Sequence, residues 1–151
     1  MRVEIVCTGN ICRSPMGEVV LRHKLAEAGV DGVQVSSSGT GGWHAGDRMD
    51  PRAAAALRRR GYDGSAHRAQ QYERSADRDL VLAMDSGHLD TLTRYGVAAQ
   101  LFARDDVPDP YYGEDDGFDE VLTQIEKAAG TWVDRLRDQP GPKPDRSPTS
   151  G

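Results

Sequence analysis

The N-terminal residues pass from a short apolar run into a proline-marked helix start, and only a tight connection separates the two. The run VEIV at residues 3–6 has the composition of a short buried strand. Ser14 followed by Pro15 is typical of a helix N-cap and first helical position. Residues 7–14, CTGNICRS, are therefore expected to form a loop wedged between a strand end and a helix start.

This loop has the residues of an anion site. First-turn N–H groups of a helix lack intrahelical acceptors, and with the helix dipole they favour a negative charge. Cys7 lies in that field, which favours its thiolate form, and Arg13 offers a planar fork for two phosphate oxygens. The other residues expected to ring the anion are Thr8, Gly9, Asn10, Ile11, Cys12 and Ser14. A Cys-x5-Arg pattern also arises by chance, but the strand before it and the helix after it favour a thiol nucleophile in an anion cradle.

Size and charge limit the class of protein. The 151 residues, 37% of them hydrophobic, fit one compact domain with its own core. Nineteen basic and 24 acidic residues give a net charge of −5 without a basic stripe, which argues against nucleic acid as a partner. No segment approaches the roughly 20 apolar residues of a membrane span, and the N-terminus lacks a signal-peptide pattern. We therefore expect a cytoplasmic protein without a membrane partner.

The chain has two cysteines, Cys7 and Cys12, both inside the expected loop. They form neither a disulfide framework of the secreted kind nor a zinc-ligand spacing. We expect reduced thiols, no metal and no cofactor. Cys12 has two possible roles, as a packed core residue or as a redox partner that captures an oxidised Cys7 as a disulfide.

Helical and strand patterns alternate along the rest of the chain. Helices are expected at residues 14–28, 50–61, 85–95 and 118–136, strands at 33–35 and 80–84, and loops at 36–42 and 105–120. The continuous apolar run at 80–84 is typical of a central parallel strand, and the loop at 105–120 holds eight carboxylates and no basic residue. Residues 139–151 hold four of the eight prolines, which predicts a disordered tail after a single domain at 1–138.

This alternation predicts an α/β fold, a four-stranded parallel sheet with helices on both faces, doubly wound. Ligands of such sheets bind beyond the carboxyl ends of the strands. Cys7, the serine-rich loop at 36–42, Asp85 and the acidic loop at 105–120 are all expected to leave the sheet at that end. They should therefore meet at one edge of the sheet.

A thiol that attacks phosphorus expels an ester oxygen, and that oxygen needs a proton from another group. Asp109 is the candidate acid, because Pro108 and Pro110 stiffen its loop over the expected cleft. Tyr111 and Tyr112 follow as an aromatic wall suited to a flat aryl ester. The alternative is an ordinary Asp-Pro turn whose tyrosines shield the core.

The segment VCTGNICRSP from Val6 and the later DPYY from Asp109 together resemble the low-molecular-weight protein tyrosine phosphatases, over residues 3 to about 137. The resemblance implies hydrolysis of phosphotyrosine and aryl phosphate monoesters in phosphotyrosine-containing protein substrates. It implies a phosphocysteine intermediate on Cys7, phosphate binding by Arg13, and Asp109 as general acid and then base. We expect a monomer or a weak dimer.

The resemblance also implies supporting roles. Ser14 would stabilise the Cys7 thiolate, and Asn10 would lock the loop through Ser37 and His67. The remaining implied roles are Asp85 as the partner that orients Arg13, and Trp43 as a specificity residue opposite the two tyrosines. Each residue also has a plainer interpretation: His67 as a surface histidine, Asp85 as a helix N-cap, and Trp43 as a loop anchor.

Two other functions remain open. Arsenate reductases share the fold and the Cys-x5-Arg loop, but they use further redox cysteines downstream, and this chain has none after Cys12. A phosphate-binding module without turnover would lack either the nucleophile or the acid, whereas this sequence offers a candidate for both.

Overall fold

The computed structural model describes residues 1–111 and 113–138, and strands and helices alternate through them. The elements in chain order are β1 (Arg2–Cys7), α1 (Arg13–Glu27), β2 (Gln34–Gly39), α2 (Pro51–Arg59), β3 (Leu80–Ala83), α3 (Ser86–Arg94), β4 (Gln100–Leu101) and α4 (Asp115–Asp138). The predicted tail at 139–151 and Tyr112 lie outside the described residues.

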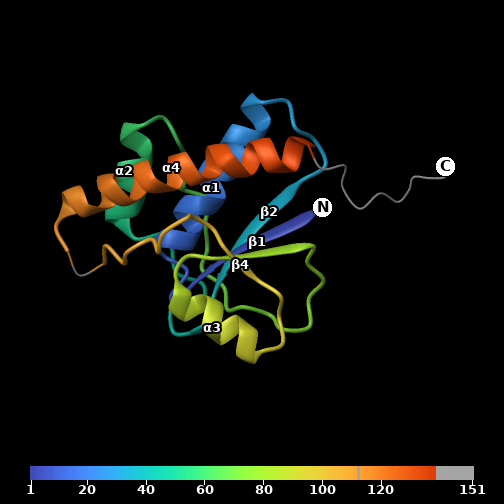
Figure 1. Cartoon of the computed structure of the whole chain (residues 1–151). Coiled ribbons are helices and arrows are strands. Elements are labelled where there is room, and N and C mark those ends of the chain that lie inside the picture. Colours follow the sequence, from blue (N-terminus) through green and yellow to red (C-terminus); the bar gives the residue numbers. More distant parts are fainter. Residues whose placement is uncertain (112, 139–151) are drawn as a thin grey trace.

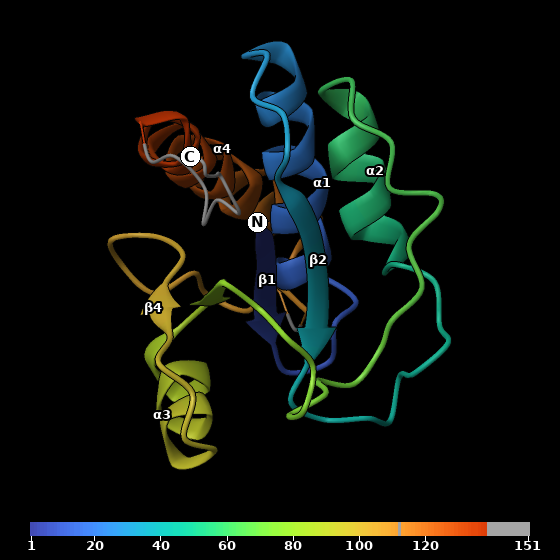
Figure 2. The ribbon, with the colours of Figure 1, turned by 90° about the vertical axis from the view of Figure 1, so that its right-hand side faces the viewer.

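The four strands form one parallel sheet in the order β2-β1-β3-β4. Helices α1, α2 and α4 cover one face and α3 covers the other (Figures 1 and 2). The predicted fold class is therefore confirmed. The sequence pattern assigns no residues to the fourth strand, because β4 has only two residues and so shows no period.

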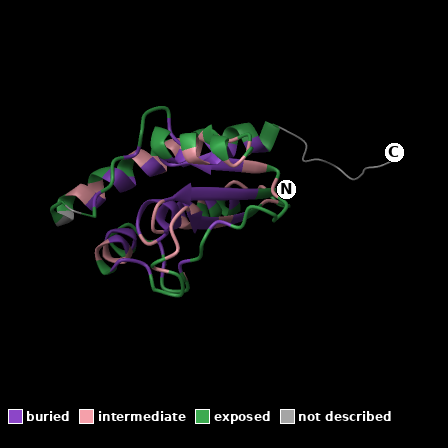
Figure 3. Ribbon diagram, turned by 90° about the horizontal axis from the view of Figure 1, so that it is seen from below, coloured by how far each residue is buried: buried purple, intermediate pink, exposed green. Residues whose placement is uncertain are grey.

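Side chains of β1 pack on both faces of the sheet. Val3 and Ile5 belong to the larger core under α1 and α4, whereas Val6 belongs to the smaller core on the α3 side. Both central strands are buried between the helical layers, and the outward helix faces are exposed (Figure 3). Such two-sided burial explains why the strand sequences read as nearly continuous apolar runs.

The strand order reverses at β1, because β2 lies on one side of it and β3 on the other. A reversal of this kind opens a crevice at the carboxyl ends of the strands. Cys7 is the last residue of β1, and Asp85 stands two positions after the end of β3. The predicted meeting edge is therefore the place where the fold leaves room for a ligand.

Strand β2 is longer than predicted, since residues 36–39, expected as loop, continue the pairing with β1. The serines tolerate a strand here because their hydroxyls are satisfied. Ser36 and Ser38 both donate to the buried Glu4 carboxylate, and Ser37 faces the opposite side and donates to Glu18 at 2.6 Å. The sequence alone does not reveal these carboxylate partners, and for that reason the serine-rich pattern predicts a loop.

Two helix starts also differ from the prediction. Helix α1 begins at Arg13 with Cys12 as its N-cap, so Ser14 lies inside the first turn and is not the cap. Helix α4 begins at Asp115, within the stretch 105–120 that the sequence pattern predicts to be a loop. A carboxylate such as Asp116 near the start of the helix suits the positive end of the helix dipole, which explains why a charged run continues as helix.

Candidate functional site

The loop after β1 is held in shape by Asn10, which is fully buried and adopts a left-handed backbone at φ 58°. Its side-chain amide donates to Ser14 Oγ at 2.9 Å and to Ser37 Oγ at 3.0 Å. His67 Nε2 lies 2.8 Å from the Asn10 carbonyl oxygen, and the Gln70 N–H donates to Asn10 Oδ1 at 2.9 Å. The structure thus brings Asn10, Ser37 and His67 together, and it adds Gln70, which no sequence motif marks.

The backbone at the end of β2, at residues 39–41, packs closely against the loop and holds it in place. A side chain at Gly39 would place its Cβ 2.4 Å from the Thr8 carbonyl oxygen, so only glycine allows this close approach. The Gly41 N–H donates to that same oxygen at 3.0 Å. These contacts therefore hold the loop through its carbonyl oxygens and not through its N–H groups.

Cys7 lies at the floor of this loop, with its Sγ 2.9 Å from Ser14 Oγ. The amide of Asn10 donates to the same hydroxyl oxygen, which polarises the hydroxyl toward donation. A thiolate is the strongest acceptor within reach of that proton, since charge-assisted hydrogen bonds are stronger than neutral ones. The contact is therefore suited to stabilise Cys7 as an anion.

The guanidinium of Arg13 is held from behind, and the residue is only 5% exposed. Its Nη1 donates to Asp85 Oδ2 at 2.7 Å and to the Val107 carbonyl at 2.9 Å. Burial alone would raise the pKa of Asp85, but hydrogen bonds from the His88 N–H and from Arg13 outweigh it and lower that pKa. Asp85 is thus an anion that fixes Arg13, and it is also the N-cap of α3.

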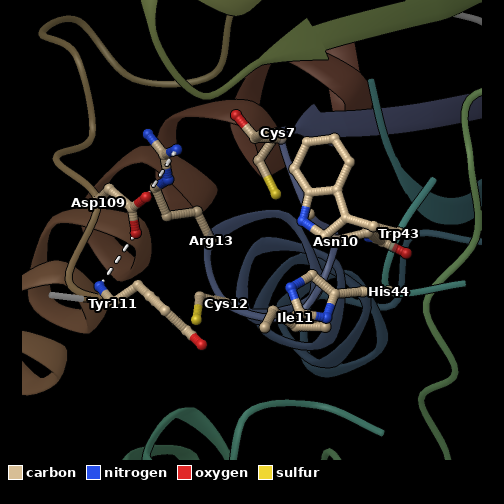
Figure 4. Close-up of a pocket in the computed structure, with 11 residues that line it drawn as sticks. Cys7, Asn10, Ile11, Cys12, Arg13, Trp43, His44, Asp109 and Tyr111 are labelled. Atoms are coloured by element: carbon tan, nitrogen blue, oxygen red, sulfur yellow. Dashed lines mark hydrogen bonds and ion pairs between the residues drawn. The ribbon is translucent and has the colours of Figure 1, made fainter. Parts of the chain in front are cut away.

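Asp109 faces Arg13 from the far wall, with Asp109 Oδ2 lying 3.7 Å from Arg13 Nη2 (Figure 4). Its Oδ1 accepts the N–H of Tyr111 at 3.0 Å, so the predicted Asp-Pro turn is present as well. Its side chain is 42% exposed, and the loop before it is tied to α3 by Asp106, which accepts from Ser86 at 2.8 Å. A carboxyl in that position can reach both solvent and a ligand.

Cys7, Arg13 and Asp109 line one pocket of about 90 Å³. Its floor is the loop, residues 7–13, and its walls are Trp43 and His44 on one side and Asp109 and Tyr111 on the other (Figure 4). The Trp43 side of the wall is open to solvent, with the residue 70% exposed. An aromatic group entering over the loop would thus pass between aromatic side chains.

Cys12 lines the same pocket but is buried, and burial raises the pKa of its thiol, with the Asp50 carboxylate adding to the rise. It therefore stays protonated near neutral pH, unlike a nucleophile. Both cysteines are free. Among residues 1–111 and 113–138, no group of three or more histidines, cysteines and carboxylates is placed to hold a metal ion, and no helix is long and apolar enough to cross a membrane.

Sequence reasoning misses two histidines at this site. His44 lines the pocket beside Trp43, and no motif marks it. His88 places its Nε2 2.7 Å from Thr8 Oγ1, and its one signal in the sequence is a position three residues after Asp85. Both positions depend on how segments distant in the sequence meet, which neither pattern nor spacing reveals.

The family model described as low molecular weight phosphotyrosine protein phosphatase matches residues 2–141. The low molecular weight protein-tyrosine-phosphatase of Streptomyces coelicolor is 43% identical over 156 residues, covering 91% of this chain and 94% of that protein.

Among solved structures, a low molecular weight phosphotyrosine phosphatase from Vibrio cholerae has a TM-score of 0.85 and 32% identity, covering 92% of this chain and 98% of its own. Vibrio vulnificus Wzb in complex with benzylphosphonate has a TM-score of 0.79 and 30% identity, covering 89% and 97%. These matches, together with the loop and its pocket, place the chain in the low molecular weight phosphotyrosine protein phosphatase family.

Proposed function

We propose that this protein-tyrosine phosphatase hydrolyses phosphotyrosine and aryl phosphate monoesters through a phosphocysteine on Cys7. The observation that carries the proposal is the convergence of three groups on one pocket. Cys7 lies at its floor, Arg13 is held beside it by Asp85, and Asp109 faces both from the opposite wall. A two-step phosphoryl transfer needs a nucleophile, a phosphate-binding cation and an acid, and Cys7, Arg13 and Asp109 have these chemistries in turn.

In the first step the loop N–H groups and Arg13 bind the phosphate oxygens. The Cys7 thiolate attacks phosphorus, a P–S bond forms, and the bond from phosphorus to the aryl oxygen breaks. Asp109 gives its proton to that oxygen, so the alcohol leaves neutral. Arg13 neutralises charge on the transferring group with a planar fork, and Asp85 holds that fork in place.

In the second step water attacks the phosphocysteine. Asp109, now a carboxylate, accepts a proton from that water as the P–S bond breaks. Inorganic phosphate leaves, and Cys7 returns to a thiolate stabilised by the Ser14 hydroxyl. Asn10 keeps the loop in shape through both steps, supported by Ser37 and His67.

Substrate choice follows from the pocket walls. Trp43 and Tyr111 can flank an aromatic ring above the loop. Tyr112, which lies outside the described residues, stays a proposed specificity residue from the sequence. Wzb of Vibrio vulnificus binds benzylphosphonate, which joins an aromatic ring to a phosphonate as an aryl phosphate joins it to a phosphate. The substrates proposed for this chain are proteins that carry phosphotyrosine.

The surroundings proposed for the enzyme follow from its cysteines and charge. A free thiol nucleophile suits a reducing compartment, and we place the protein in the cytoplasm. Its net charge of −5 favours neither nucleic acid nor an anionic membrane surface as a partner. We propose that it acts as a monomer or weak dimer.

Arsenate reduction finds less support. That reaction needs thiols that pass an oxidised state between them, and the chain has only Cys7 and Cys12. Cys12 is held as a buried thiol. A binding module without turnover also fits less well, because an acid faces the nucleophile across the pocket.

Pre-steady-state hydrolysis of p-nitrophenyl phosphate tests the proposal. We expect a burst of p-nitrophenol equal to the enzyme concentration, because the first step releases the alcohol before the phosphocysteine is hydrolysed. Cys7→Ser should lose the burst and several orders of magnitude of turnover, while it still binds inorganic phosphate. Wild-type turnover in Cys7→Ser would exclude Cys7 as the nucleophile.

A further inference from the structure

His88 lies next to the phosphate loop and has no part in the chemistry proposed above. It is the third residue of α3 and only 5% exposed. Its Nε2 is 2.7 Å from the hydroxyl of Thr8, the residue that follows Cys7 and lines the pocket. A buried histidine thus contacts the phosphate loop directly from a different element.

The other ring nitrogen faces the partner of Arg13. His88 Nδ1 lies 3.1 Å from Asp85 Oδ1, outside hydrogen-bond geometry, and it has no hydrogen-bond partner elsewhere in the described parts of the chain. The same carboxylate accepts the His88 backbone N–H at 2.9 Å and binds Arg13 at 2.7 Å. The His88 ring therefore lies between Thr8, which belongs to the phosphate loop, and Asp85, which holds the Arg13 guanidinium.

The surrounding charges determine where the ring carries its proton. The carboxylate near Nδ1 favours a proton on that nitrogen, so Nε2 accepts from the Thr8 hydroxyl. Burial lowers the pKa of His88, and the positive charge of Arg13 lowers it further. The negative charges that oppose this shift come from Asp85, Asp109 and Asp106. The net effect keeps the ring neutral near pH 7.

We propose that neutral His88 is a positioning residue for the phosphate loop, because it holds the Thr8 hydroxyl on one side and braces the Asp85–Arg13 pair on the other. This inference rests on the proposed function, since the loop and Arg13 are the groups that bind the substrate phosphate. His88 itself touches no reacting atom in the proposed chemistry.

Protonation should weaken this arrangement. A second ring proton forces Nε2 to donate to Thr8, so the hydroxyl must turn. It also adds a positive charge 3.1 Å from Asp85 Oδ1, where it competes with Arg13 for the carboxylate. Because the pKa of His88 is lowered, the neutral form still predominates at the ordinary histidine value of about 6.5 and is lost only at lower pH.

A double-mutant cycle tests the contact with Thr8. His88→Leu removes the hydrogen bond at similar volume, Thr8→Val removes the hydroxyl with little change in shape, and the third variant carries both changes. We expect each single variant to lower kcat/KM for p-nitrophenyl phosphate by roughly fivefold to tenfold, the effect of one buried hydrogen bond. The double variant should lose no more than the worse single one.

Matched variants separate positioning from a general structural effect. His88→Gln keeps a polar group for Thr8 and should recover most of the lost kcat/KM. His23→Gln changes an exposed histidine on α1 and should match the wild type. Additive losses in the cycle, or wild-type activity in His88→Leu, would overturn the proposal, and thermal unfolding of each variant shows whether a loss reflects unfolding.

The pH profile tests the protonation state. Dividing the wild-type kcat/KM by that of His88→Gln at each pH cancels ionisations shared by substrate, nucleophile and acid. We expect this ratio to be constant down to about pH 6.5 and to fall only at lower pH, where His88 takes up its second proton. A ratio independent of pH would rule out a requirement for neutral His88.

The affinity for inorganic phosphate, measured by calorimetry on the same variants, distinguishes a failure of the proposed function from a failure of the His88 proposal. An inactive wild type would contradict the proposed function. The variants would still report on His88, because its loss should weaken phosphate binding whether or not the protein turns substrate over.

Discussion

At the scale of single residues, the sequence identifies the groups that carry chemistry better than the groups that position them. Cys7 and Arg13 can be predicted because a strand end and a helix start fix their places, and both line the pocket. For Ser14 the sequence pattern predicts a helix cap, which is wrong, whereas the family resemblance predicts a partner of Cys7, and its hydroxyl lies 2.9 Å from Cys7 Sγ from inside the first turn. His88 escapes prediction because its contact with Thr8 joins residues 80 positions apart.

The carboxyl of Asp109 should matter most for substrates whose alcohol leaves poorly. Asp109→Asn keeps the shape but removes the proton, so hydrolysis of an alkyl-substituted phenyl phosphate should fall by about 10²- to 10³-fold. Hydrolysis of p-nitrophenyl phosphate, whose phenol is already acidic, should fall much less. Steady-state rates across a series of phenols check this, and equal losses for all of them would remove Asp109 from the acid role.

Cys12 should protect the nucleophile from irreversible oxidation. Burial, the first cause of its raised pKa, keeps it a thiol near neutral pH. A Cys7 sulfenic acid formed by peroxide would condense with that thiol to a disulfide and release water. After peroxide treatment, a thiol reductant should restore the wild type but restore Cys12→Ser much less. Mass spectrometry of the Cys7 peptide follows the oxidation state, and identical recovery of both proteins would mean that Cys12 only packs.

At the scale of elements, strands and helices are predictable where a period is long enough to read, as in α2 and α3. Their capping aspartates, Asp50 and Asp85, accept N–H groups of the first turn. The errors fall where a side chain finds a distant partner. The predicted β2 is too short because the sequence does not show that Ser38 donates a hydrogen bond to Glu4 on the neighbouring strand. Strand β4 has too few residues to show a pattern.

Strand β1 carries a buried charge that ties it to the segment before β3. Glu4 and Arg78 are both nearly buried, and Arg78 Nε lies 2.5 Å from Glu4 Oε1. Removing one charge leaves the other uncompensated, so Arg78→Leu should lower the free energy of unfolding by about 3 kcal/mol or more. Urea denaturation followed by circular dichroism measures this loss.

The exposed pair Arg59–Asp119 provides the control for that measurement. Arg59→Ala should cost less than about 1 kcal/mol, because water screens an exposed ion pair. Adding Glu4→Gln to Arg78→Leu should recover part of the loss, since the unpaired buried charge disappears. Equal costs for Arg78→Leu and Arg59→Ala would show that burial contributes nothing to this pair.

At the scale of the whole molecule, the reversal of strand order explains why sequence patterns alone locate the candidate site. Parallel strands bring their carboxyl ends to one edge, so the loop that follows Cys7 at the end of β1 meets Asp85 after β3, where Arg13 pairs with it. The distance from Asp109 to Arg13 cannot be inferred in this way. It depends on how the loop after β4 is tied to α3 and to Arg52, which accounts for the 3.7 Å approach.

The central claim is that phosphorus becomes bonded to one sulfur. Rapid acid quench during turnover of p-nitrophenyl phosphate, followed by mass spectrometry of the peptides, measures this directly. The account predicts one added phosphoryl group on the peptide containing Cys7, located on that residue and absent from Cys7→Ser. A phosphoryl group on any other residue, or steady turnover with none on Cys7, would contradict it.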